Sequence, residues 1–104
     1  MASFERGEVW LVDLGYVAKT RPCLILSVAV TPDDRALVTC VPHTTAARGT
    51  RFEVALSLGF LQSGVFDAQN LVTTSLVKPL RRLGVLSPDQ FAPVEDAVRR
   101  WLGL

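Results

Sequence analysis

The hydrophobic pattern of this chain changes its period near residue 87, from short β-type segments to a single helix. Apolar segments at 8–14, 24–29 and 36–41 are separated by turn residues such as Thr31-Pro32-Asp33-Asp34, which is typical of antiparallel strands. Ser87-Pro88-Asp89-Gln90 then combines a serine N-cap, a proline at the first helical position and a glutamine at N3, the pattern of a helix start. The chain is therefore predicted to form a β-fold followed by one helix.

The predicted helix carries a single apolar stripe and ends near the C-terminus. Two arginines and Gly103 stand where the last turn and the C-cap are expected. The apolar residues recur at three- and four-residue spacing, which is typical of a helix that covers a core: Phe91, Val94, Val98, Trp101 and Leu102.

Further strands are predicted at 52–56, 65–71 and 76–86, so the fold class is mainly β (α+β). The expected architecture is a small SH3-like barrel of curved antiparallel strands with a C-terminal helix. The apolar run at 8–14 is nearly continuous, which indicates a strand covered on both faces. Trp10 and Phe52 are expected in the core rather than as platforms for nucleobases.

With 104 residues, the chain fits one domain spanning 1–104. Hydrophobic residues make up 49% of it, yet no apolar run approaches the roughly 20 residues that cross a bilayer. The N-terminus also lacks the apolar segment of a signal peptide. We therefore expect a soluble cytoplasmic protein without a membrane partner.

The residues that commonly bind transition metals are few and scattered. His43 is the one histidine, and Cys23 and Cys40 lie in separate apolar segments. Free cysteine in such a segment usually packs as a small hydrophobe. We expect core cysteines, no metal site and no cofactor.

Charge is distributed unevenly along the chain. Residues 15–52 carry five cations and two aspartates, whereas residues 1–14 have an excess of acids and residues 53–104 are balanced. A basic middle segment permits a polyanionic partner, although charge alone favours a solvated loop surface.

Two strand ends offer the side chains that bind a phosphodiester. Arg21 begins one apolar segment, and His43, Thr44 and Thr45 follow another that ends at Val41. A guanidinium forms a rigid fork for phosphate oxygens, and a hydroxyl can donate to the same group. Transesterification of RNA also needs proton transfer from the 2′-hydroxyl and to the leaving 5′-oxygen, but its internal nucleophile requires no metal.

Strand geometry leaves His43 and Thr44 as competing candidates, because neighbouring side chains of a strand face opposite sides. Each has a structural interpretation as well: His43 could bond a loop carbonyl, and Thr44 or Thr45 could cap the loop backbone. Asp67 and Gln69 are expected to form a structural hydrogen-bond network.

Five blocks in this order resemble the MazF/PemK family of toxin–antitoxin endoribonucleases over nearly the whole chain. They are Arg6-Gly7-Glu8-Val9-Trp10, Arg21-Pro22 with its apolar segment, Val41-Pro42-His43-Thr44-Thr45, Arg48-Gly49, and Phe52-Glu53-Val54. The resemblance implies a barrel-like homodimeric toxin that cuts single-stranded mRNA without metal, leaving a cyclic phosphate and a free 5′-hydroxyl.

The resemblance also assigns roles to residues. Arg21 and Thr44 match the two catalytic positions of the family. Lys19, His43, Thr45, Arg48 and Arg51 are then expected to support catalysis or bind the RNA backbone. The implied partners are single-stranded RNA and a cognate antitoxin whose acidic C-terminal segment orders on binding.

The chain departs from the family pattern in three places. The loop at 15–20 looks short, and Ala68 precedes Gln69 where relatives often have an acid. Leu71-Val72 stands where relatives often have a basic residue shortly after the glutamine that matches Gln69. Two alternatives therefore stay open. One is a CcdB-type poison that grips gyrase through Trp101-Leu102-Gly103-Leu104, and the other is a catalytically silent β-barrel binding module.

Overall fold

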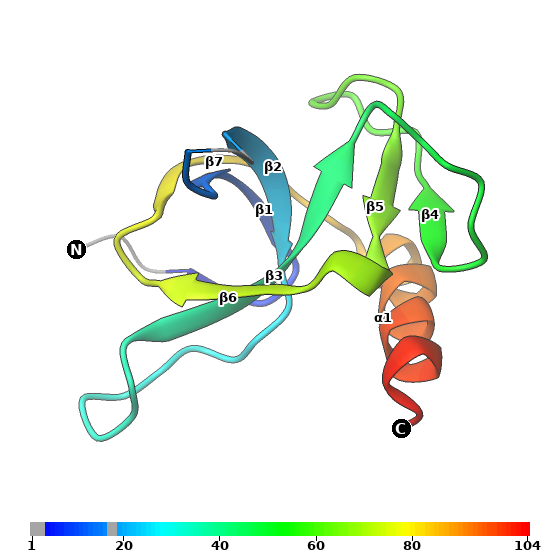
Figure 1. Ribbon diagram of the computed structural model, residues 1–104. Helices are drawn as coiled ribbons and strands as arrows, with labels where there is room; N and C mark the ends of the chain where they lie inside the picture. The colour runs from blue at the N-terminus through cyan, green and yellow to red at the C-terminus, as the bar shows by residue number, and fades with distance from the viewer. Residues whose placement is uncertain (1–3, 17–18) are drawn as a thin grey trace.

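A computed structural model describes residues 4–16 and 19–104, and it consists of antiparallel strands with one C-terminal helix (Figure 1). This agrees with the predicted fold class. The elements in chain order are β1 Glu8–Asp13, β2 Thr20–Ile25, β3 Leu37–Thr44, β4 Glu53–Ala55, β5 Val65–Asp67, the 3₁₀-helix η1 Ala68–Asn70, β6 Val72–Ser75, β7 Pro79–Val85 and α1 Pro88–Leu102.

Strand β3 is the centre of the sheet, whose order is β4-β5-β3-β2-β1-β7 with β6 also paired to β3. The first half of β3 pairs with β6, from Leu37 opposite Ser75 to Cys40 opposite Val72. Its last two residues pair with β5 instead. Because one strand joins two parts of the sheet, the chain curls into a barrel on one side and reaches α1 on the other (Figure 1).

The sheet is covered on both faces, as its apolar strands predict. Successive residues of β2 alternate between two cores: Leu24 packs in the cluster beneath α1, whereas Cys23 and Ile25 pack inside the barrel. Trp10 belongs to the barrel core and Phe52 to the helix-side core. Both aromatics are buried, so the prediction that they are core residues is confirmed.

Helix α1 starts as its sequence predicts. The Ser87 hydroxyl accepts from the Gln90 amide, the Gln90 side chain accepts from the Ser87 amide, and Gly103 forms a left-handed C-cap. Val94, Ala97 and Val98 are buried against the sheet. The end of the stripe is more open than predicted, because Trp101 and Leu102 are exposed.

Four strand predictions are wrong in their bounds, and β6 lies between two predicted strands and was not predicted. The predicted strand 36–41 continues to Thr44, so His43 and Thr44 belong to β3 itself. β2 begins at Thr20, before Pro22, and ends at Ile25. Its pairing with β3 starts only at Cys23, so the missing donor of Pro22 stands at the edge of that ladder. The remaining part of the predicted segment, 26–29, lies outside the strand.

The predicted strand 65–71 ends early, because the Asp67 carboxylate accepts from the Gln69 amide and caps η1. The predicted strand 76–86 begins late, because a turn separates β6 from β7. In that turn the Lys78 amide donates to the Ser75 carbonyl at 3.0 Å. The expected short loop at 15–20 includes residues 17 and 18, which lie outside the described residues.

Candidate active site

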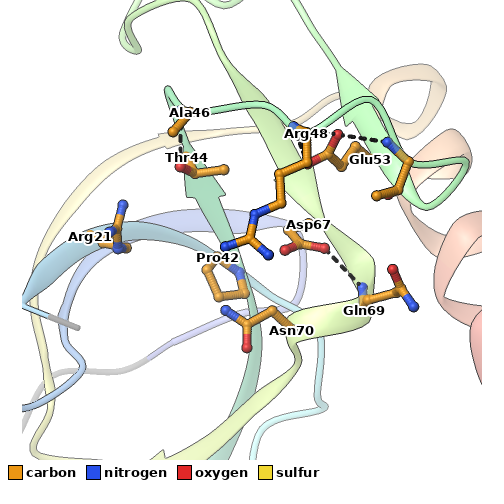
Figure 2. A pocket seen from close by; sticks show the side chains of 10 residues that line it. Arg21, Pro42, Thr44, Ala46, Arg48, Glu53, Asp67, Gln69 and Asn70 are labelled. Atoms are coloured by element: carbon orange, nitrogen blue, oxygen red, sulfur yellow. Dashed lines mark hydrogen bonds between the residues drawn. The ribbon is translucent and has the colours of Figure 1, made fainter. Parts of the chain in front are cut away.

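A polar pocket of about 560 Å³ opens beside the ends of β2 and β3 (Figure 2). Its wall combines strand ends, the loop that follows β3, and the segment around η1. The lining residues, hereafter the polar pocket, are Arg21, Pro42, Thr44, Ala46, Arg48, Thr50, Glu53, Asp67, Gln69 and Asn70.

Arg21 and Thr44 reach this pocket from neighbouring strands. Cys23 of β2 pairs with Pro42 of β3, and Arg21 and Thr44 each lie two residues beyond that pair. Since side chains alternate along a strand, both residues stay on the face of Cys23 and Pro42. The sequence prediction that the two strand ends meet in one polar pocket is therefore confirmed.

The Thr44 hydroxyl has a local partner. Its Oγ1 accepts from the Ala46 amide at 3.1 Å, so the predicted loop cap is present. An accepted hydrogen bond uses a lone pair and leaves the hydroxyl hydrogen free to donate. Thr44 can therefore cap the loop and donate to a ligand oxygen at the same time.

Arg48 provides the second cation of the polar pocket. Its side chain runs from the loop across the opening toward Asp67 and Pro42 (Figure 2). The loop itself is held by Glu53 of β4, whose carboxylate accepts from the amides of Arg48, Gly49 and Thr50. These bonds stabilise the ionised form, and they lower the pKa of Glu53 from its ordinary value.

The opposite wall contains Asp67, Gln69 and Asn70. Asp67 Oδ1 accepts from the Gln69 backbone amide at 3.2 Å, so the Asp67 side chain has a structural partner, as predicted. The amide side chains of Gln69 and Asn70 are exposed. They present donors and acceptors that could bind base edges.

A second pocket of about 290 Å³ lies on the other side of the β2 and β3 ends and shares Arg21 with the polar pocket. His43 and Thr45 line it, together with apolar side chains that include Phe60 and Leu83. The alternation of β3 thus separates the competing candidates, since Thr44 lines one pocket and His43 the other. Arg21 is the residue that both pockets have in common.

His43 is buried, with 4% of its surface exposed. Its ring packs edge-on against Phe66, with 5.0 Å between ring centroids. Burial lowers the pKa of His43 from its ordinary value, because desolvation disfavours the charged imidazolium. His43 is therefore neutral at pH 7 and adds no positive charge to the site.

Two other predicted RNA-binding residues lie elsewhere. In the part of the chain that the structure describes, neither Lys19 nor Arg51 lines the two pockets. Lys19 is exposed and has a left-handed backbone with φ of 60°. The Arg51 guanidinium stacks on Phe52, 4.6 Å from the ring centroid, and the Arg51 carbonyl accepts from Arg100 of α1.

Metal ligands do not gather anywhere in residues 4–16 and 19–104: no group of three His, Cys, Asp or Glu side chains could hold an ion there. Cys23 and Cys40 are both buried and free, as predicted for core residues. A hydrogen bond with Cys40, together with burial, raises the pKa of the Cys23 thiol. Within the same described ranges, no helix is long and apolar enough to span a membrane.

Comparison with known proteins identifies the family. Residues 5–102 match the family described as PemK-like, MazF-like toxin of type II toxin–antitoxin system. The chain belongs to this family. Members of the family are endoribonucleases, which favours that class over a CcdB-type poison.

Solved structures of related toxins share the fold over nearly the entire chain. An endoribonuclease from Mycobacterial species, solved with its cognate antitoxin, is 30% identical, with a TM-score of 0.82 and coverage of 97% of this chain and 96% of the other. Another mycobacterial endoribonuclease is 28% identical, with a TM-score of 0.81 and coverage of 100% and 95%. MazF in a MazE–MazF structure from Deinococcus radiodurans is 25% identical, with a TM-score of 0.82 and coverage of 100% and 99%.

Several residues that were not predicted as site residues also line the two pockets. Glu53, Thr50 and Asn70 line the polar pocket, and Gln62 and Arg81 line the second one. A sequence signal existed for Glu53 alone, because a carboxylate shortly after a Gly-containing loop is placed to accept from that loop's amides. The others depend on which strands become neighbours.

Proposed function

We propose that this toxin cleaves single-stranded RNA in the polar pocket, with Arg21 and Thr44 as its catalytic residues. One observation carries the proposal: neighbouring strands bring a guanidinium and a hydroxyl to one face of a pocket that also contains Arg48. A guanidinium fork and a hydroxyl donor are suited to the equatorial oxygens of a phosphodiester.

The reaction would be a metal-independent transesterification. The 2′-oxygen attacks phosphorus as its proton leaves, the P–O2′ bond forms, and the P–O5′ bond breaks as the 5′-oxygen gains a proton. Arg21 and Thr44 stabilise the negative charge that builds up on the non-bridging oxygens. The products are a 2′,3′-cyclic phosphate and a free 5′-hydroxyl.

Supporting roles follow from position. Arg48 binds the RNA backbone within the polar pocket, and His43 and Thr45 contact the nucleotide on the other side of Arg21. Lys19 and Arg51 contribute to the general attraction of RNA from outside both pockets. Sequence selectivity then comes from base edges held by the exposed amides of Gln69 and Asn70.

We further propose that the toxin acts as a homodimer in the cytoplasm and is neutralised by a cognate antitoxin. Related toxins have been solved with their antitoxins. The arginines of the polar pocket would suit an acidic segment of the antitoxin that becomes ordered on binding. Such a segment would exclude RNA from the same pocket.

The experiment is cleavage of a long single-stranded RNA by the purified toxin in EDTA, followed by mapping of the new ends. Discrete fragments with 5′-hydroxyl ends and a shared sequence at the cuts are expected. Intact RNA at a high concentration of folded toxin would contradict the proposal and would favour a silent binding module. Fragments that require added Mg²⁺ would contradict the metal-independent mechanism.

A further inference from the structure

A carboxylate lines the polar pocket in a place where it works against the binding of a phosphate. Glu53 belongs to the pocket wall together with Arg21 and Arg48. A like charge near an anionic ligand costs affinity, so a carboxylate in this wall needs a compensating purpose. Its hydrogen bonds indicate what that purpose is.

Three consecutive backbone amides converge on Glu53. Oε1 accepts from Gly49 at 2.7 Å, and from Arg48 and Thr50 at 3.1 Å each. Oε2 accepts from Arg48 at 3.0 Å. Gly49 has a left-handed φ of 79°. Glycine adopts this backbone conformation at no steric cost, so the loop can turn its amides toward Glu53. The loop residues are exposed, so these bonds fix a segment that core packing does not hold.

Glu53 is itself part of the sheet. Glu53 is the first residue of β4 and pairs with Asp67 of β5. Its backbone amide also donates to the Thr50 carbonyl at 3.3 Å. The carboxylate therefore ties the backbone of Arg48 to the sheet that carries Asp67, the residue toward which the Arg48 side chain extends (Figure 2).

We propose that Glu53 is a positioning residue for RNA cleavage, which holds residues 48–50 so that Arg48 is presented to the RNA backbone inside the polar pocket. The inference rests on the proposed nuclease function. Glu53 does not touch the RNA and acts through Arg48. Without the carboxylate, residues 48–50 lose their common acceptor, and the Arg48 guanidinium samples many positions before it meets a phosphate.

The test is a double-mutant cycle on cleavage of an RNA oligonucleotide that spans a mapped cut site. Glu53→Ala is expected to lower kcat/KM about tenfold, mainly through KM, as loss of one backbone contact does. Arg48→Ala is expected to have a similar effect. In the Arg48→Ala background, Glu53→Ala should change kcat/KM little, because the residue through which it acts is gone.

Salt dependence gives a second readout that a purely structural role would not change. Both single variants should reduce the slope of log KM against log salt by about 0.7, the amount for one phosphate contact on a single strand. Asp33→Ala is the matched control, since it removes an exposed carboxylate of the turn before β3. It makes the same change in net charge and should leave kcat, KM and the slope unaltered.

Equal losses from Glu53→Ala with and without Arg48 would overturn the inference, as would a loss confined to kcat with an unchanged salt slope. If the Glu53→Ala variant does not fold, the same cycle is measured with Glu53→Gln, because the glutamine side chain keeps one acceptor oxygen for the loop amides. Glu53→Gln should then show a smaller KM effect that again vanishes in the Arg48→Ala background. Wild-type toxin that leaves RNA intact in EDTA would instead contradict the nuclease function itself.

Discussion

Arg21 and Thr44 lie on the same face of neighbouring strands, each two residues beyond the paired Cys23 and Pro42. This relationship fixes where a guanidinium and a hydroxyl can meet. Below the pocket, the same face of the two strands continues into the buried Cys23, Ile25 and Cys40. A packed core of this kind holds the two strand ends in place, which is what stabilising a transition state requires.

Removal of the Arg21 guanidinium should abolish most catalysis without unfolding the toxin. Arg21 is exposed, so Arg21→Ala should retain the far-UV circular dichroism of the wild type. We expect the cleavage rate to fall by about 10²–10³, the usual loss for one charge-stabilising group. Arg35→Ala, at an exposed arginine in the turn before β3, is the control. Full activity of Arg21→Ala would show that the chemistry lies elsewhere.

Two substitutions at Thr44 distinguish the contribution of its hydroxyl to cleavage from that of its side-chain shape. Thr44→Val keeps the branched shape but loses both the donor and the acceptor for the Ala46 amide. Its cleavage rate should fall on the order of 10²-fold. Thr44→Ser retains the hydroxyl and should keep most of the activity. Single-turnover cleavage assays measure both, and an equally active valine variant would exclude a role for the hydroxyl.

Gly64 should tolerate no side chain, because it lies against the end of β3. A Cβ at Gly64 would stand 2.3 Å from the Thr44 carbonyl oxygen and 2.7 Å from His43 Cε1. Gly64→Ala must therefore shift either its own backbone or the backbone that carries Thr44. We expect a loss of roughly 1–3 kcal/mol in the free energy of unfolding, together with slower cleavage.

The matched control is Gly59→Ala, since nothing lies within 4 Å of a Cβ at Gly59. Its stability should stay within about 0.5 kcal/mol of the wild type. Urea unfolding measures both variants. Equal stability of the two would mean that the close approach at Gly64 is not present in solution.

Stability should fall as the pH is lowered through the range where histidine titrates. His43 is the one histidine of the chain, and burial lowers its pKa in the folded state. In the unfolded chain it binds a proton with a pKa of about 6.5. Below that pH the unfolded state takes up more protons than the folded state, so the free energy of unfolding decreases until the folded pKa is passed.

Urea unfolding at intervals between pH 7.5 and 5.5 measures this effect. His43→Gln cannot titrate, and its free energy of unfolding should change much less over the same interval. The Glu53 carboxyl does not interfere, because its lowered pKa places its titration below this window. Parallel pH profiles for the wild type and His43→Gln would contradict the buried neutral state of His43.

The helix start contributes to stability but not to catalysis. Ser87→Ala removes the acceptor for the Gln90 amide and should cost about 1 kcal/mol. The exposed Ser63 has no such role, and Ser63→Ala should be neutral. Cleavage rates measured well below the melting temperature should be unchanged in both variants. A large loss of activity in Ser87→Ala would indicate that α1 affects the site more directly.

Local patterns predicted those features that depend on neighbours in sequence. The capping box at Ser87 and the burial of Trp10 both follow from short-range patterns. Strand bounds were less predictable where side-chain hydrogen bonds or a proline interrupt the hydrogen bonds between neighbouring strands. Asp67 ends β5 by capping η1, and Pro22 is tolerated because β3 begins to pair only at Cys23.

The sequence by itself determined the helix, most of the strands, the two polar strand ends and the family to which the toxin belongs, because periodicity, caps and motif order are local properties of a chain. It did not determine β6 or η1. The tertiary structure alone decided which side chains share a pocket. It separated His43 from Thr44, placed Arg51 on Phe52 and brought Glu53 to the amides of the Arg48 loop. The physical reason is that a pocket is formed by residues distant in sequence, and their spacing is fixed only when strand register and burial are settled together.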